Sequence, residues 1–238
     1  MKERDAHYPY ADGSRYRGKD NVEIFGEIYR EKTWNLMHQD SASGEGSNHA
    51  QTAQIRKTLP KLLNSLDIQR LLDVPCGDFY WMQQVDLSKI DYTGGDIVPE
   101  LVRENQAQYE SDIRKFTQLD LTHDALPPSD MIFCRDCLVH LSFHDIKAVF
   151  TNILQSKVDW VLMTHFPEEP RNKDILTGGW RPLNFCLPPF DLPSPHLLIN
   201  GGCTEMEGAF LDKSLGCWRT SDLKALPFLD VHFNELVK

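Results

Sequence analysis

The sequence predicts an α/β protein whose core is a Rossmann-like, doubly wound and mostly parallel sheet of seven strands. Two observations carry this prediction. From residue 70 to residue 165, short apolar runs of strand length alternate with longer segments of helical periodicity, as they do in folds built from βαβ units. The first apolar run, residues 71–74, leads at once into a Pro-Cys-Gly turn, as a buried parallel strand does where it enters a ligand-binding loop.

Strands and helices are expected to alternate along the first two thirds of the chain. A helix is expected over 48–66, where Ser47 is a candidate N-cap and Pro60 is expected to kink or interrupt the helix. Ser142 and Asp145 form a candidate capping box for the helix that follows the fourth strand. The predicted strands are 70–74, 91–97, 115–119, 131–134, 159–165, 197–199 and 214–218.

Two segments lie outside this alternation. Residues 1–47 are polar and rich in tyrosine and glycine, which favours an N-terminal arm or lid over the single domain formed by 48–238. Residues 167–200 are rich in proline and directly follow the fifth predicted strand. A long irregular segment at such a place is typical of a binding loop, so 167–200 is expected to be the substrate loop.

Composition excludes several classes of partner. The net charge of -10 argues against an extended phosphate-binding surface, and so against a nucleic-acid partner. No segment approaches the roughly 20 apolar residues of a membrane span, and the charged N-terminus leads into no signal-peptide core. We therefore expect a cytoplasmic protein without a membrane partner, whose six cysteines are reduced thiols.

Three acids, Asp73, Asp96 and Asp120, stand at the ends of the first three predicted strands. In an open α/β sheet these strand ends form the ligand crevice. Asp96 lies 23 residues after Asp73, close to the offset of about 20 for an acid that binds ribose hydroxyls. The first loop has one glycine where a dinucleotide loop has three, which favours S-adenosylmethionine over NAD. Asp73 would then attract the positive charge of the cofactor and Asp120 its adenine amino group; the alternative is that the acids only cap the helices that follow.

Over residues 48–166 the chain resembles the class I S-adenosylmethionine-dependent methyltransferases. Asp73 and Gly77 match the acid and central glycine of the family's first motif, while Pro75 and Phe79 replace its outer glycines. The Pro-Cys-Gly-Asp-Phe loop, the Cys-Arg-Asp-Cys-Leu-Val-His-Leu strand exit and the Gly-Gly-Trp-Arg-Pro-Leu-Asn loop are similar to those of a bacterial subgroup associated with glycan biosynthesis. The resemblance implies a set of cofactor-binding residues: Asp73, Pro75, Cys76, Gly77, Phe79, Trp81, Asp96, Ile97, Asp120, Leu121 and Arg135.

The segment after the fourth predicted strand carries the candidate catalytic residues. Asp136 and His140 are four residues apart, so on a helical turn they share a face, where the carboxylate can orient the imidazole as a general base. His165 is the alternative base. A second interpretation makes Asp136 a helix cap and His140 a packed histidine. Arg135 is expected to bind an anionic group or to pair with a neighbouring acid.

The same segment has the spacing of a possible zinc site, Cys-x2-Cys-x2-His-x3-His, formed by Cys134, Cys137, His140 and His144. Structural zinc sites usually draw their two ligand pairs from separate elements, whereas these four residues would come from one strand end and one helix start. We therefore expect no metal.

The proline-rich loop supplies arginines, carboxamides and an indole, a combination that suits a polar acceptor with an anionic or sugar-like face. The leading hypothesis is therefore O-methylation of a sugar, a glycan precursor or another polar small metabolite. The alternatives are methylation of nitrogen or of a phosphate-type oxygen, and a cofactor-binding protein without catalysis. The candidate substrate-binding residues are Arg171, Asn172, Thr177, Trp180, Arg181 and Asn184.

Overall fold

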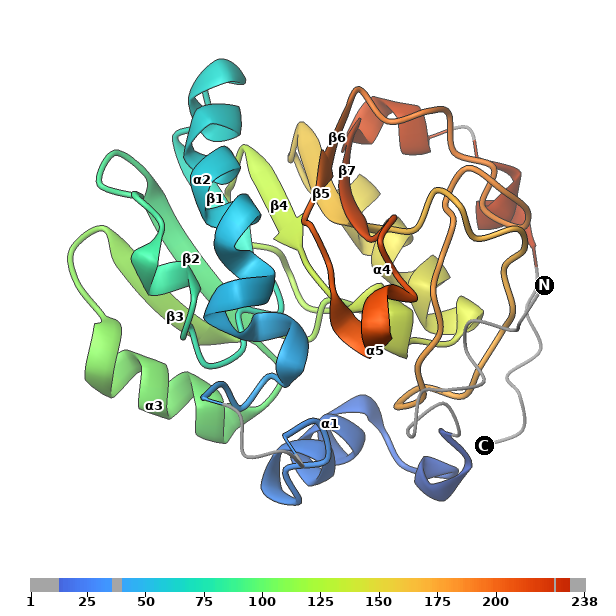
Figure 1. Cartoon of the computed structure of the whole chain (residues 1–238), viewed down its shortest axis with the longest axis horizontal. Helices are drawn as coiled ribbons and strands as arrows, with labels where there is room; N and C mark the ends of the chain where they lie inside the picture. Colours follow the sequence, from blue (N-terminus) through green and yellow to red (C-terminus); the bar gives the residue numbers. More distant parts are fainter. Residues whose placement is uncertain (1–12, 36–39, 225, 232–238) are drawn as a thin grey trace.

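The computed structural model describes residues 13–35, 40–224 and 226–231, and within them it confirms the predicted fold class. Seven strands form one sheet in the order β3-β2-β1-β4-β5-β7-β6, with helices packed around it (Figure 1). Each predicted strand is present to within one residue at either end. The strands are β1 (Arg70–Asp73), β2 (Asp91–Asp96), β3 (Arg114–Gln118), β4 (Met131–Cys134), β5 (Trp160–His165), β6 (Leu197–Asn200) and β7 (Ser214–Arg219).

The topology places the ends of β1 and β4 at the centre of the molecule. Strands β1 to β5 pair in parallel, whereas β7 is antiparallel to both β5 and β6. The chain builds outward from β1 through β2 to β3 and then returns to place β4 on the other side of β1. Such a reversal is the switch point at which open α/β sheets bind their ligands.

Local sequence explains where the helices begin. Asn48, rather than the expected Ser47, caps the second helix by accepting the Gln51 N–H, and the helix continues through Pro60 as one element. Ser142 caps the fourth helix as expected, with its hydroxyl accepting the Asp145 N–H. The helices are α1 (Asn21–Arg30), α2 (His49–Ser65), α3 (Pro99–Tyr109), α4 (Phe143–Gln155) and the short α5 (Glu205–Gly208).

The sheet has an apolar core on each face, because neighbouring residues of a strand point to opposite sides. On one face Leu72 packs in a cluster that includes Val149 and Phe150 of α4. On the other face Leu71 packs in a cluster that includes Leu59 of α2. Both clusters hold the strands rigidly, so that the loops at the carboxyl ends of β1, β2 and β4 have a fixed base.

Two long segments complete the molecule. The arm contributes α1, which lies across one end of the sheet (blue in Figure 1). The segment between β5 and β6 is irregular from Phe166 to His196 and is held together by its own side chains. Asn172 donates to the carbonyls of Asn184, Leu187 and Pro188, so this segment has a defined path despite its lack of regular structure. None of the described helices is long and apolar enough to cross a membrane.

Candidate functional site

A large pocket opens at the carboxyl ends of β1, β2 and β4, where the strand order reverses. Its empty space, including the open mouth, is about 1550 Å³. Its walls come from the three strand ends, the arm, the segment after β5 and the segment around α5.

The loop after β1 forms one wall. Asp73 is 3% exposed and accepts a 2.5 Å hydrogen bond from the Tyr92 hydroxyl. Burial raises the pKa of Asp73 to about 8 because the charged form is poorly solvated there. Gly77 follows at φ +57°, and a Cβ at this position would lie 2.3 Å from Oγ of Ser43 in the arm. Glycine therefore allows both the turn and the close approach of the arm.

Asp96 connects this loop to β2. Its Oδ2 accepts the N–H of Gly77 at 3.0 Å and its Oδ1 accepts the N–H of Val98 at 2.9 Å. The carboxylate is 4% exposed, and burial raises its pKa to about 6 against the opposing effect of the two backbone donors. Asp96 therefore fixes the β1 loop while its oxygens border the pocket.

Asp120 occupies the corresponding place after β3. Its Oδ1 accepts both the N–H of Thr122 at 2.8 Å and the Thr122 hydroxyl at 2.6 Å. Through these contacts Asp120 caps a turn and not a helix, because the described residues between β3 and β4 form no helix, and it also lines the pocket together with Leu121.

Ten of the eleven candidate cofactor residues line the pocket, and Phe79 does not. Phe79 is 1% exposed and packs against Tyr92, Tyr109 and Phe116 in the core below the loop. Its backbone lies in the left-handed region, with φ +56°. The ten that line the pocket are Asp73, Pro75, Cys76, Gly77, Trp81, Asp96, Ile97, Asp120, Leu121 and Arg135.

Asp136 does not lie on a helical turn, contrary to the expectation. It has φ +52° directly after β4, and its Oδ2 lies 3.2 Å from the Arg135 guanidinium and 3.0 Å from Nζ of Lys213. Lys213 also binds Glu205 at 2.9 Å. Burial alone would raise the pKa of Asp136, but the two cations outweigh burial and hold the pKa well below its usual range. We call Arg135, Asp136, Glu205 and Lys213 the ion cluster.

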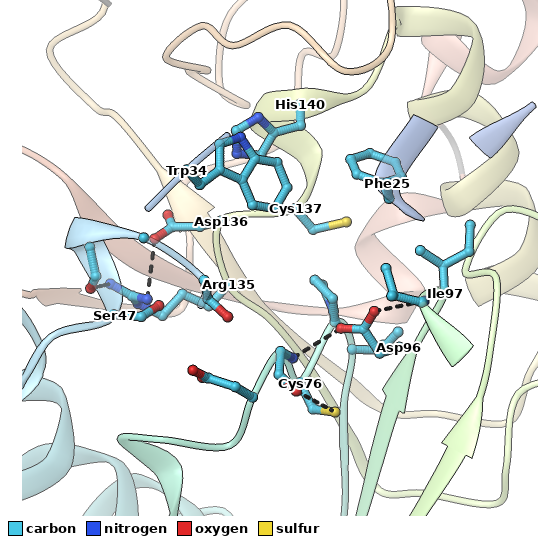
Figure 2. Close-up of a pocket in the computed structure, with 18 of the residues that line it drawn as sticks. Phe25, Trp34, Ser47, Cys76, Asp96, Ile97, Arg135, Asp136, Cys137 and His140 are labelled. Atoms are coloured by element: carbon cyan, nitrogen blue, oxygen red, sulfur yellow. Dashed lines mark hydrogen bonds and ion pairs between the residues drawn. The ribbon is translucent and has the colours of Figure 1, made fainter. Parts of the chain in front are cut away.

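His140 is oriented by a backbone carbonyl rather than by Asp136. Its Nδ1 lies 2.8 Å from the Gly179 oxygen, and no hydrogen bond joins it to Asp136 within the described residues. Because a carbonyl only accepts, Nδ1 carries the proton and Nε2 carries a lone pair. Burial lowers the pKa of His140 to about 4, so the ring is neutral at neutral pH. Figure 2 shows His140 beside Trp34, with the ion cluster's Arg135 and Asp136 on one side and Asp96 on the other.

The structure places His165 away from the pocket. The side chain is 2% exposed, and its Nδ1 accepts the Phe185 N–H at 3.2 Å. The ring also lies edge-on to Trp218 in the core. His165 is therefore a packed histidine that supports the path of the loop. Because it lies away from the pocket, the sequence interpretation of it as an alternative base is wrong.

Arg181 was expected to contact an acceptor, but it binds the protein backbone. It is 1% exposed and donates to the carbonyls of Leu138 at 2.7 Å, Leu141 at 2.5 Å and Lys173 at 3.2 Å. Leu138 and Leu141 flank His140. Arg181 therefore joins the irregular loop to the turn that carries the histidine.

Only one of the six candidate substrate residues, Trp180, lines the pocket. Asn172 and Asn184 bond carbonyls inside the loop. Thr177 donates to Asp145 and accepts the Ser142 N–H, which ties the loop to the start of α4. Arg171 is exposed outside the pocket. The polar residues of the loop thus stabilise the loop, because an irregular backbone needs side chains to satisfy its donors and acceptors.

The arm lines the pocket, a contribution that no sequence motif assigned to particular residues. Phe25 and Tyr29 of α1, Trp34 and the turn at 42–47 all face the cavity. The capping box formed by Asp20 and Glu23 at the start of α1 is a sequence signal that could have located this helix. Residues 1–12 and 36–39 of the predicted arm lie outside the described residues.

Asp78 fastens the arm to the β1 loop. Its carboxylate accepts the Ser41 hydroxyl at 3.0 Å and the Ala42 N–H at 2.7 Å. We expect Asp78→Ala to speed tryptic cleavage at Arg30 and Lys32 about tenfold, because hydrogen bonds to a charged group contribute about 1.5–3 kcal/mol each. Limited proteolysis measures this rate. Asp86→Ala, on an exposed turn, is the matched control, and equal cleavage rates in the two variants would contradict the role of Asp78.

The described residues contain no group of three or more histidine, cysteine, aspartate or glutamate side chains arranged to hold a metal ion. Cys134 is 1% exposed in the core of β4, whereas Cys137 and His140 line the pocket. His144 is on the outer surface of α4 and its Nδ1 lies 3.3 Å from Asp145. The four residues with zinc-like spacing are therefore not brought together.

Comparison with known proteins identifies the fold. No family model and no curated protein matches the sequence. Among solved structures, human N-acetylserotonin methyltransferase in complex with SAM matches at 14% identity and a TM-score of 0.58, over 83% of this chain and 59% of that one. The chain thus spans less than two thirds of that enzyme. The N-methyltransferase NodS from Bradyrhizobium japonicum in complex with S-adenosyl-L-homocysteine matches at 12% identity and a TM-score of 0.57. This match covers 84% of this chain and 98% of that one.

A third structure, the methyltransferase domain of bacterial CtHen1, matches at 13% identity and a TM-score of 0.50, over 72% of this chain and 98% of that one. At these identities the likeness is one of fold. The chain has the Rossmann-like fold of S-adenosylmethionine-dependent methyltransferases.

Proposed function

We propose that this chain is an S-adenosylmethionine-dependent methyltransferase that methylates a hydroxyl oxygen of a small-molecule acceptor. The observation that carries the proposal is the convergence of Asp73, Asp96 and Asp120, from three strand ends, on one pocket beside the Gly77 turn. The methyltransferase fold and the position of the pocket at the switch point support it.

The residues present fit the cofactor. Each Asp96 oxygen accepts one backbone N–H and keeps a second lone pair for a ribose hydroxyl. Asp120 lines the pocket together with the apolar residues Ile97 and Leu121, and we assign it to the adenine amino group. Asp73 lies at the other end, where a bound positive charge would favour its ionised form.

His140 is the proposed general base. When bound, S-adenosylmethionine would supply a methyl group whose C–S electron pair would stay on sulfur as the acceptor oxygen is methylated. Nε2 of His140 would take the proton that the acceptor hydroxyl loses. The Gly179 carbonyl keeps Nδ1 protonated, which leaves Nε2 as the basic atom. Asp136 belongs to the ion cluster and fixes the backbone after β4 through Thr164, whose hydroxyl it accepts at 3.0 Å.

A sugar or glycan-type acceptor falls within this proposal. The main sequence argument for such an acceptor was the set of six candidate substrate residues in the proline-rich loop, and of these only Trp180 lines the pocket. The pocket therefore supports a hydroxyl acceptor in general, with His140 placed to receive the proton.

Calorimetric titration with S-adenosyl-L-homocysteine, the demethylated product, tests cofactor binding. We expect Asp96→Ala to weaken affinity at least tenfold, because hydrogen bonds to a charged group are worth about 1.5–3 kcal/mol each. Asp96→Asn, which keeps an acceptor for Gly77, is expected to show an intermediate loss. Asp91→Ala, at the opposite end of β2, is the matched control. Wild-type affinity in both Asp96 variants would contradict the assignment of the ribose site.

A further inference from the structure

Trp34 of the arm forms a flat wall against His140. Their ring centroids are 4.6 Å apart, with the planes 33° from parallel, and Figure 2 shows the two rings side by side with Cys137 next to them. Trp34 comes from a segment more than a hundred residues away in the sequence. The arm therefore brings an indole directly to the proposed base.

Three more aromatic rings line the pocket on the β5 side. Phe166 follows β5, and its ring lies edge-on to those of Trp180 at 6.2 Å and Phe210 at 5.8 Å; the Trp180 and Phe210 rings are 5.0 Å apart. Strands β2 and β3, which carry the proposed ribose and adenine acids, lie on the other side of β1. The aromatic rings are therefore at the end of the pocket left for the acceptor.

The charges at this end neutralise each other. Lys213 lies 3.0 Å from Asp136 and 2.9 Å from Glu205, and Arg135 lies 3.2 Å from Asp136 and donates to the Gly46 carbonyl. These are the lysine and the arginine that line the pocket within the described part of the chain. Both cations are already paired with acids. An anionic acceptor would therefore lose its hydration on binding without gaining an ion pair, which is unfavourable. The other acidic residues of the pocket are Glu45, Asp73, Asp78, Asp96 and Asp120, and none of them would attract an anion.

One polar atom at this end lacks a partner. Nε1 of Trp34 is buried and makes no hydrogen bond in the described structure. A buried N–H without an acceptor is unfavourable, so a ligand that brings an oxygen to it would be favoured. Nε2 of His140 is the complementary group, because it accepts. A single ligand hydroxyl within reach of both nitrogen atoms would accept from Trp34 and donate to His140.

We propose, on the basis of the methyl-transfer function above, that the acceptor is a neutral molecule with a flat apolar ring that carries the reacting hydroxyl. Trp34 selects it by ring contact and by donating from Nε1 to the hydroxyl oxygen. The aromatic rings supply the apolar surface, and the paired ion cluster disfavours acceptors with a carboxylate or phosphate.

Calorimetry with matched probes tests this class. The protein is first titrated with S-adenosyl-L-homocysteine and then, in its loaded form, with 2-naphthol, 6-hydroxy-2-naphthoate and methyl glucoside. We expect 2-naphthol to bind at least tenfold more tightly than either of the other two probes. Equal or tighter binding of the carboxylate or of the glucoside, or no binding of 2-naphthol, would overturn the proposed acceptor class. Failure of the first titration would instead contradict the proposed function itself.

Two variants test the role of Trp34. Trp34→Phe keeps a ring and removes the N–H, and we expect it to weaken 2-naphthol binding about five- to tenfold with no change in affinity for S-adenosyl-L-homocysteine. Trp160→Phe, at the start of β5 and outside the pocket, is the control and is expected to bind as the wild type does. Wild-type binding of 2-naphthol by Trp34→Phe would overturn the role of the indole N–H.

Discussion

Replacing His140 by alanine is expected to lower kcat by roughly 10²–10⁴-fold, the usual contribution of general acid–base catalysis. Affinity for S-adenosyl-L-homocysteine should stay near that of the wild type, because His140 lies apart from the three strand-end acids. Release of the demethylated product from a confirmed acceptor measures the rate. Since burial lowers the pKa of His140 to about 4, the base is unprotonated at any higher pH, and the ratio of wild-type to variant rates should be constant from about pH 6 to about pH 8.

His144→Ala is the matched control for this measurement. His144 is 48% exposed on α4 and outside the pocket, so its loss should leave turnover unchanged. Added imidazole should restore part of the activity of His140→Ala by occupying the vacated space. Full turnover in His140→Ala would show that methyl transfer here needs no base and proceeds by alignment of the reacting atoms alone.

Replacing Arg181 by methionine is expected to destabilise the fold by about 3–5 kcal/mol. The arginine satisfies three backbone carbonyls in a buried place, and each carbonyl left without a donor costs about 1–3 kcal/mol, less where the chain relaxes. Although burial lowers the pKa of Arg181 to about 9, the side chain still carries its charge at neutral pH. Urea denaturation measures the change in the free energy of unfolding.

The comparison for Arg181→Met is Arg103→Met, on the exposed side of α3, which should change stability by less than about 0.5 kcal/mol. A stable Arg181→Met variant whose only defect is a raised KM for the acceptor would restore the interpretation of Arg181 as a substrate-binding residue.

Local patterns were enough to predict the sheet and the cofactor side of the pocket. The short apolar runs of β1, β4 and β5 can be recognised from neighbouring residues alone. Asp73 and Asp96 end their strands and Asp120 lies two residues after β3, so their place at one edge follows from parallel topology. The sequence assigned Phe79 to the cofactor site, but its ring packs in the core. Its backbone has a positive φ, which sequence patterns do not indicate for phenylalanine.

The acceptor side could not be predicted because its contacts join distant segments. Whether Arg181 faces a ligand or a carbonyl depends on the path of a loop without periodicity. The partner of Asp136 is Lys213, and the ring beside His140 is that of Trp34; neither pairing follows from sequence spacing. The four-residue separation of Asp136 and His140 suggested a helical face, but the backbone at Asp136 is left-handed.

The most direct test of the central claim is a crystal structure of the protein with S-adenosyl-L-homocysteine. The account predicts the ribose hydroxyls within hydrogen-bond distance of Asp96, the adenine beside Asp120 and Leu121, and the sulfur facing the pair of rings formed by Trp34 and His140. Binding of the product elsewhere, or with its sulfur turned away from His140, would contradict the account.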